Sequence, residues 1–264
     1  MSTTQQTAPL TVYWQPGCTS CLRTKEFLTR HGVPFVSVNV VADAQGFEAL
    51  ARLGLRQVPI VARGDDWVNG QVIKDVARIA GISLDTQRML APAELTTRIG
   101  IMLGAARRAF VQLPESMLDT TLPNRPQTYR QLACHVFQIA EAFLDLVEHG
   151  KRLEFAAYVQ DVPPHVHGRD GLVAFGAGIE ERFACWWEQT GRSADWRQEA
   201  DVYYGEQTLH EFLERTAWHA AQHTRQLQMI VEKLGLPVDG PLTEADLQGL
   251  PVPEHVWDDK MAFN

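Results

Sequence analysis

Short apolar runs alternate with amphipathic stretches over the first eighty or so residues, and this alternation predicts strands and helices in turn. The β-prone runs occupy residues 11–14, 35–41, 58–62 and 67–68. The helical runs occupy residues 22–31, 47–53 and 72–80, and each is followed by a glycine, as is common after a helix end. The predicted order is β-α-β-α-β-β-α, in which the valine-rich run 35–41 is expected to form a buried strand.

From about Ser83 onwards, long helical periods replace the β-prone runs. The four longest occupy residues 93–113, 128–150, 171–190 and 208–235. Four amphipathic helices of this length predict an all-α four-helix bundle. Prolines in the last thirty residues predict an extended tail with one short turn. The expected organisation is a flexible N-terminus at 1–9, an α/β domain at 10–83, a linker at 84–93, a helix bundle at 94–240 and an extended C-terminal tail at 241–264.

Composition narrows the possible functions. A length of 264 residues with 45% hydrophobic residues favours two folded domains. The formal net charge of −8 disfavours a polyanionic partner, so we expect no nucleic-acid binding. The most apolar helical stretch contains Arg107 and Arg108, which argues against a membrane span. The N-terminus lacks the layout of a secretory signal, and four cysteines do not make a disulfide scaffold, so we expect a cytoplasmic protein.

Two of the four cysteines form a CxxC motif where a predicted strand ends and a helix begins. The first turn of a helix stabilises a thiolate through its unpaired N–H groups and the positive end of its dipole. Cys18 is therefore the expected nucleophile, and Cys21, one turn later, is expected to resolve the mixed disulfide. Arg23 and Lys25 add positive charge nearby. The alternative, half of a zinc knuckle, requires two more ligands at a matching spacing.

The segment YWQPGCTSC at 13–21 resembles the strand–CxxC–helix entry of the glutaredoxin and NrdH-redoxin family. The segment QVPIV at 57–61 is similar to the one in which that family has a cis-proline facing the two cysteines. The resemblance covers residues 10–82 and implies a thioredoxin-like fold. It also implies that Val58 and Pro59 bind the thiol substrate, with Val58 presenting its backbone N–H and C=O. Asn69-Gly70-Gln71 replaces the Gly-Gly-Asp-like turn of glutathione-binding members. The disulfide could therefore be reduced either by glutathione or by thioredoxin reductase.

In the helical part, His219 and His223 are four residues apart, so both rings leave one face of the predicted helix. Such a pair suits a metal, although histidines in a core often need no metal. His135 is the histidine midway along the second long helix and is the candidate third ligand. Cys134 and Cys185 are most simply core cysteines.

The region from about residue 94 to 258 is similar to the DinB/YfiT-like superfamily of metal-dependent helix bundles, through His135, the His219–His223 pair and the proline-containing tail. The resemblance implies a three-histidine site for zinc, nickel or iron, with open positions for water or substrate. Characterised enzymes of this superfamily are often transferases and isomerases that use low-molecular-weight thiols such as glutathione, and their bundles often form homodimers. Ala220 stands where a zinc protease places its general base, so peptide hydrolysis is not expected.

Three hypotheses follow from the two sites. The first is a thiol-dependent, metal-assisted transferase or reductase that acts on a small electrophile or thiol conjugate, while Cys18 and Cys21 exchange disulfides with its product or with a low-molecular-weight thiol. The second is a glutaredoxin-type disulfide carrier whose helical domain serves only for docking or metal sensing. The third is a metal-buffering or stress protein that binds thiophilic ions.

Overall fold

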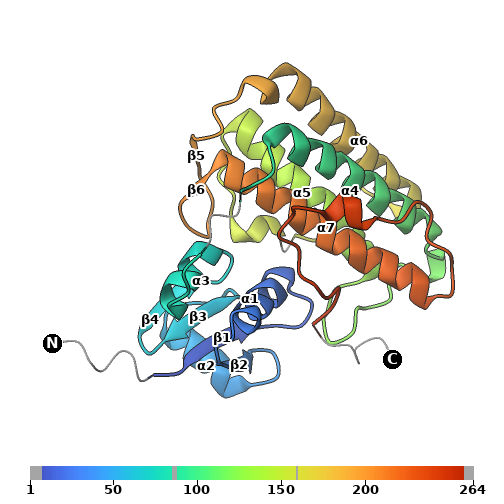
Figure 1. The fold of residues 1–264 in the computed structure, drawn as a ribbon. Coiled ribbons are helices and arrows are strands. Elements are labelled where there is room, and N and C mark those ends of the chain that lie inside the picture. The colour runs from blue at the N-terminus through green and yellow to red at the C-terminus, as the bar shows by residue number, and fades with distance from the viewer. Residues whose placement is uncertain (1–7, 85–87, 159, 259–264) are drawn as a thin grey trace. The chain divides into compact units, whose positions relative to one another are not determined.

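The computed structural model describes residues 8–84, 88–158 and 160–258 of the chain. Its contacts divide it into two compact units, which are described separately (Figure 1). The first unit contains the residues up to Arg88 and the segment that begins at Pro253, and the second contains Met89–Val252. Most of the expected flexible N-terminus, part of the expected linker and the last six residues lie outside the described residues.

The first unit has the element order that the hydrophobic pattern predicts. Its elements are β1 (Leu10–Trp14), α1 (Thr19–Arg30), β2 (Phe35–Asn39), α2 (Ala44–Arg52), β3 (Ile60–Arg63), β4 (Asp66–Asn69) and α3 (Ile73–Ala80). The sheet order is β2-β1-β3-β4, with β1 parallel to β2 and antiparallel to β3, and β3 antiparallel to β4. This is a thioredoxin-like α/β arrangement, as the resemblance implied.

The core of the first unit lies between the central strands and the helices. Val12 of β1 and Val61 of β3 are fully buried, and they share a hydrophobic cluster with Leu28 of α1 and Val76 of α3. The expectation that residues 35–41 form a buried strand is wrong, because β2 is an edge strand and Val36 is 47% exposed. Valine content alone does not distinguish an edge strand from a central one.

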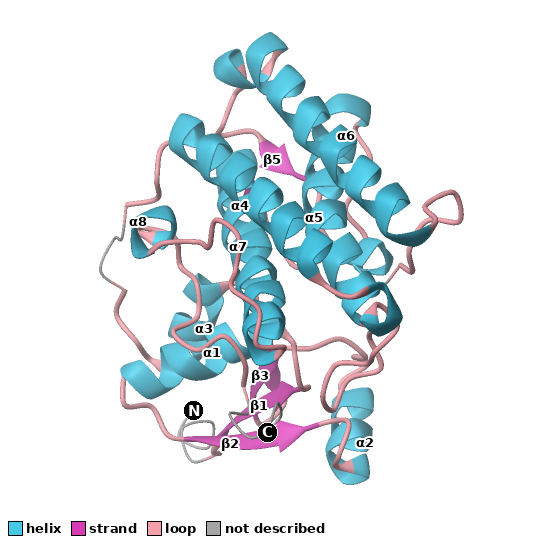
Figure 2. Cartoon of the chain, turned by 90° about the vertical axis from the view of Figure 1, so that its right-hand side faces the viewer, coloured by secondary structure: helices cyan, strands magenta, loops and turns pink. Residues whose placement is uncertain are grey.

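The second unit is mainly helical. Its four long helices are α4 (Pro92–Gln112), α5 (Tyr129–His149), α6 (Gly168–Gln189) and α7 (Leu209–Lys233). Its shorter elements are η1 (Glu115–Met117), η2 (Phe155–Tyr158), η3 (Gly191–Ser193), β5 (Glu199–Ala200), β6 (Gln207–Thr208) and α8 (Glu244–Leu247). The long helices pack against one another, with α7 in contact with both α4 and α5 (Figure 2). They lie where the helical periods predicted them.

Local sequence signals explain where these helices begin and end. Thr128 and Gln131 form a capping box before α5, and Thr208 and Glu211 form another before α7. Gly150 ends α5 with a φ of 62°, a left-handed conformation that glycine adopts at little cost. The two helices that carry the histidines of interest therefore have well-defined N-termini.

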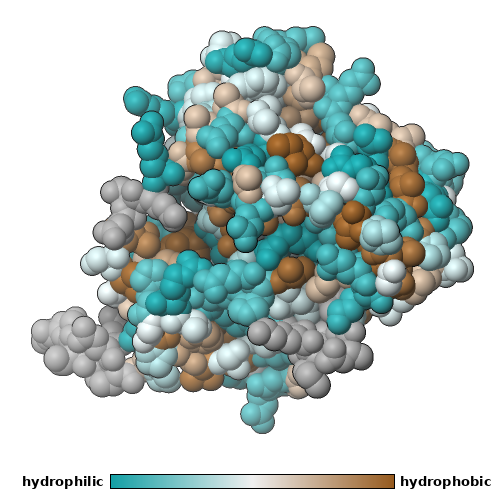
Figure 3. Space-filling model, turned by 45° about the vertical axis from the view of Figure 1, so that its right-hand side comes forward, coloured by the Kyte–Doolittle hydropathy of each residue, from teal (hydrophilic) through white to brown (hydrophobic). Residues whose placement is uncertain are grey.

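The stretch expected to be one extended tail is divided between the units. Residues 241–252, which include α8, belong to the second unit, whereas Pro253 and the described residues after it belong to the first. Among the described residues, no helix combines the length and apolar character that a membrane span requires. On the face shown in Figure 3, hydrophilic residues are interspersed with the exposed apolar ones.

Candidate functional site

The two cysteines of the CxxC motif lie at the N-terminus of α1 and are joined as a disulfide. Cys18 is the N-cap residue, and its sulfur accepts a hydrogen bond from the backbone N–H of Cys21 at 3.2 Å. Cys18 is partly exposed, whereas Cys21 is fully buried. A nucleophilic thiolate on Cys18 would therefore be accessible and close to the positive end of the helix dipole. Cys21 lies below it, as a resolving thiol requires.

The peptide bond between Val58 and Pro59 is cis. Pro59 is buried and Val58 is partly exposed. The Pro59 carbonyl accepts a hydrogen bond from the Gly70 N–H at 2.9 Å, and a Cβ on Gly70 would come within 2.9 Å of the proline ring. The Thr24 hydroxyl lies 2.7 Å from the Gly70 carbonyl oxygen, which connects this turn to α1. The turn that departs from the glutathione-binding pattern is thus packed directly against the cis-proline.

The two basic residues after the motif have different surroundings. Lys25 lies over the ring of Trp14, with its Nζ 3.4 Å from the ring centroid. Burial lowers the pKa of Lys25, and this effect outweighs the opposing influence of Asp258 and Glu26. Arg23 approaches the Gln71 carbonyl oxygen at 3.5 Å. Lys25 is therefore held at the end of β1, beside the loop that leads to Cys18.

The second unit brings together the three histidines that the sequence singled out. Each of His135, His219 and His223 is buried, and their candidate donor atoms all lie within 4.8 Å of one another. The Nε2 atoms of His219 and His223 are 3.2 Å apart. Two nitrogens bound at 2.0–2.1 Å to one tetrahedral ion lie about 3.3 Å apart, so this spacing fits a shared metal. Within the described residues, this is the one group of three or more metal-ligating side chains that is close enough to hold an ion.

Burial keeps these imidazoles neutral. It lowers the pKa of His135 and of His219 well below the ordinary value, with further lowering from His223 on the first and from Arg215 on the second. Burial likewise lowers the pKa of His223 to about 3. His223 Nδ1 lies 2.7 Å from the Gln226 side-chain oxygen, an arrangement that places the proton on Nδ1. The Nε2 atom of His223 then carries the lone pair, lies 3.2 Å from His219 Nε2 and can accept a hydrogen bond or bind a metal.

A buried cation lies beside the histidines. Arg215 is 5% exposed, donates a hydrogen bond to the Tyr158 hydroxyl at 2.9 Å and lies 3.5 Å from His219 Nδ1. Its guanidinium also lies over the rings of Tyr158 and Tyr204. Burial raises the pKa of Tyr158 to about 12, so its hydroxyl stays protonated at neutral pH. This arrangement places a permanent positive charge next to the three-histidine cluster.

Sequence reasoning did not identify Arg215, Tyr158 or Gln226 as parts of this site. Arg215 precedes His219 by four residues, and Gln226 follows His223 by three, so all lie along one stripe of α7. The available signal was the number of polar residues on α7, eight of which are buried: Arg215, Thr216, His219, Gln222, His223, Thr224, Gln226 and Gln228. Tyr158 comes from a separate element, η2, and no local pattern connects it with α7.

The two remaining cysteines differ from each other. Cys134 is buried, and this burial raises the pKa of its thiol to about 12. Cys185 is exposed, so the expectation that it is a core cysteine is wrong. On α6 the buried stripe runs through Phe183 and Trp186, and Cys185 projects away from it. Neither cysteine belongs to the three-histidine cluster.

An accessible cysteine at a helix N-terminus, joined to a buried one a turn later on a thioredoxin-like sheet, defines a thiol–disulfide redox domain. Comparison with known proteins agrees with this assignment. The glutaredoxin family model matches residues 10–73. The gene 56 protein of Mycobacterium phage L5 is 40% identical over 55 residues, which make up 20% of this chain and only about half (53%) of that protein.

Two glutaredoxin-like NrdH proteins extend the similarity. The protein of Lactococcus lactis subsp. cremoris is 25% identical over 71 residues, or 27% of this chain and 99% of that protein. The Escherichia coli protein is 36% identical over 56 residues, or 21% of this chain and 69% of that protein. The chain therefore belongs to the family of glutaredoxin-like NrdH proteins through its first unit, which supports thiol–disulfide oxidoreductase activity.

Proposed function

We propose that the protein is a thiol-dependent transferase or reductase whose helical unit carries out a metal-assisted reaction. The redox domain would exchange disulfides with the product of that reaction or with a low-molecular-weight thiol. The substrate would be a small electrophile or a thiol conjugate. The observation that carries the proposal is the buried cluster of three neutral histidines beside Arg215. Burying polar side chains lowers the stability of a fold. Disulfide exchange by Cys18 and Cys21 does not require the three histidines, so their burial points to a second function in the helical unit.

The redox step follows from the chemistry of the CxxC pair. The Cys18 thiolate attacks one sulfur of a substrate disulfide, forms a mixed disulfide and releases the other half as a thiol. The Cys21 thiolate then attacks Cys18, releases the second thiol and leaves the Cys18–Cys21 disulfide. Two electrons from a low-molecular-weight thiol such as glutathione, or from thioredoxin reductase, restore the dithiol. Glutathione and the thioredoxin system keep thiols reduced in the cytoplasm, so the need for such a reductant agrees with a cytoplasmic location.

In the helical unit, His135, His219 and His223 would hold a divalent transition metal such as zinc, nickel or iron. When bound, such an ion lowers the pKa of a coordinated thiol or water. Gln226 orients His223 by accepting a hydrogen bond from its Nδ1–H, and Arg215 brings a positive charge that favours an anionic group such as a thiolate. The resemblance to the DinB/YfiT-like superfamily, which rests on the same three histidines, implies this ligand set and a homodimer.

The test compares metal content and two activities in the full-length chain. Freshly purified protein is expected to contain about one equivalent of a transition metal, and the His219→Ala/His223→Ala double variant is expected to lose it. His165→Ala, which changes an exposed histidine of the same unit, is the matched control and should retain the metal. Metal-dependent consumption of a thiol and an electrophile should stop on chelation.

Disulfide exchange separates the leading proposal from its alternative. Cys18→Ser should abolish reduction of a small disulfide. If the protein binds no metal even after reconstitution, the metal-assisted function is refuted, and the disulfide carrier with a helical docking module replaces it. If exchange survives in Cys18→Ser, the assignment of Cys18 as the nucleophile is refuted.

A further inference from the structure

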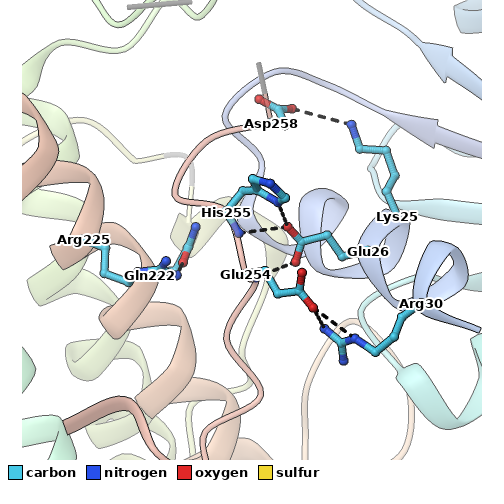
Figure 4. Close-up of polar contacts among 8 residues, drawn as sticks. All are labelled: Lys25, Glu26, Arg30, Gln222, Arg225, Glu254, His255 and Asp258. Atoms are coloured by element: carbon cyan, nitrogen blue, oxygen red, sulfur yellow. Dashed lines mark hydrogen bonds and ion pairs between the residues drawn. The ribbon is translucent and has the colours of Figure 1, made fainter. Parts of the chain in front are cut away.

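The segment Pro253–Asp258, called the C-terminal segment here, packs on the redox domain although it follows the helical unit in sequence. The Glu26 side chain of α1 accepts hydrogen bonds from the backbone N–H groups of Glu254 at 2.6 Å and His255 at 3.0 Å. His255 Nδ1 also lies 2.7 Å from Glu26, and Arg30 donates two hydrogen bonds to Glu254 (Figure 4). These contacts hold the segment along α1.

The segment places a carboxylate beside the redox motif. The Asp258 side chain is only 2% exposed, and its Oδ1 accepts a hydrogen bond from the Gly17 N–H at 3.3 Å. Gly17 is a buried residue that immediately precedes Cys18. A buried backbone N–H requires a partner, and Asp258 supplies it. The conformation of the loop that presents Cys18 therefore depends on a residue about 240 positions later in the chain.

Lys25 opposes the charge of Asp258. Its Nζ lies 4.0 Å from Asp258 Oδ2 and over the ring of Trp14, the last residue of β1. Glu26, the next residue on α1, accepts hydrogen bonds from the C-terminal segment and is a second carboxylate that acts on Lys25. Lys25 and Asp258 therefore form a charge pair at the strand end from which the CxxC loop starts.

The charge on Asp258 acts differently on the two redox states. The Cys18–Cys21 disulfide is neutral, whereas reduction creates thiols that ionise in part at neutral pH. A fixed negative charge nearby raises the free energy of the thiolate, and a positive charge lowers it. Asp258 therefore favours the disulfide, which makes the reduced pair a stronger reductant, and Lys25 favours the dithiol.

We propose that Asp258 is a positioning residue for the thiol–disulfide reaction: it holds the Gly17–Cys18 loop and shifts the redox equilibrium of the CxxC pair toward the disulfide. The reaction affected is reduction of the Cys18–Cys21 disulfide by a dithiol. Two electrons and two protons pass to the protein, and the dithiol becomes a cyclic disulfide. This proposal concerns the redox domain alone and is independent of any metal in the helical unit.

The test measures this equilibrium in the full-length chain with reduced and oxidised dithiothreitol at pH 7, and reads the reduced fraction by alkylation and mass spectrometry. Asp258→Asn keeps an oxygen that can accept from Gly17 but removes the charge. We expect the equilibrium constant for reduction to rise about threefold to tenfold, which corresponds to about 15–30 mV for a two-electron couple. The pKa of Cys18, followed by the pH dependence of its alkylation rate, should fall.

Two further variants distinguish a charge effect from general loosening of the segment. Lys25→Met should shift the equilibrium in the opposite direction, toward the disulfide. Glu254→Gln weakens an exposed ion pair of the same segment without removing a charge next to Gly17, and it should leave the equilibrium within about twofold of the original. An unchanged equilibrium in Asp258→Asn overturns the proposal. Equal shifts in Asp258→Asn and Glu254→Gln, or shifts of the same sign in Asp258→Asn and Lys25→Met, also overturn it.

Discussion

Replacing Thr24 with valine tests how the cis-proline turn is connected to the redox helix. The Thr24 side chain is fully buried, and its hydroxyl lies 2.7 Å from the Gly70 carbonyl oxygen and 2.9 Å from that of Ser20. Valine has nearly the same shape, so the substitution removes the hydroxyl and leaves little empty space. The Gly70 carbonyl loses this hydrogen bond in a buried environment, and Gly70 is the residue that donates to Pro59.

The expected loss follows from the cost of a buried polar group that loses its partner. Such a change destabilises a fold by about 1–2 kcal/mol, or about 5- to 30-fold in the unfolding equilibrium. Thr29→Val is the matched control, because it makes the same substitution at an exposed position of the same helix. Its effect should stay within about 0.5 kcal/mol.

Hydrogen exchange followed by mass spectrometry suits this comparison, because it reports the free energy of opening for the redox unit in the full-length chain. The peptides that contain α1 and the Gly70 turn should exchange about 5- to 30-fold faster in Thr24→Val than in the unmodified protein. Equal protection in Thr24→Val and Thr29→Val would refute the reasoning, because the Thr24–Gly70 hydrogen bond would then contribute nothing to the fold.

Two further predictions concern the helical unit. A Cβ on Gly176 would lie 2.5–2.8 Å from ring atoms of Phe137, so Gly176→Ala should destabilise this unit by about 1–3 kcal/mol in thermal unfolding. Gly178→Ala, where a Cβ meets no atom within 4 Å, should be neutral or slightly stabilising, and equal effects of the two substitutions would contradict the close packing. In the native protein, iodoacetamide should modify the exposed Cys185 and spare the buried Cys134, which should react only after denaturation. Comparable native rates for the two thiols would show that Cys134 is accessible.

Much of the local structure follows from patterns within a few residues. The apolar alternation predicted the element order of the redox domain, and the long helical periods predicted the four long helices of the second unit. The spacing of Cys18 and Cys21 indicated thiol–disulfide chemistry, and the spacing of His219 and His223 placed both rings on one helix face. These signals are readable because backbone hydrogen bonding and side-chain direction repeat every two residues in strands and every 3.6 in helices.

Other features depend on segments that are distant in the sequence. His135 was the candidate third ligand because it lies midway along the second long helix, and no spacing rule connects it with the α7 histidines. No pattern along the chain indicated that β2 lies at the sheet edge, or that Tyr158 would contact Arg215.

The sequence by itself determined which residues form helices and strands and where the reactive side chains are placed along them. Only the tertiary structure decided which of these residues meet. Asp258 shows the difference most clearly, because nothing near it in the chain indicates that it accepts a hydrogen bond from Gly17. The physical reason is that periodicity and capping are local properties of the backbone. Contacts between distant segments depend instead on how complete elements pack, where the total burial of apolar surface and the pairing of buried polar groups decide the arrangement.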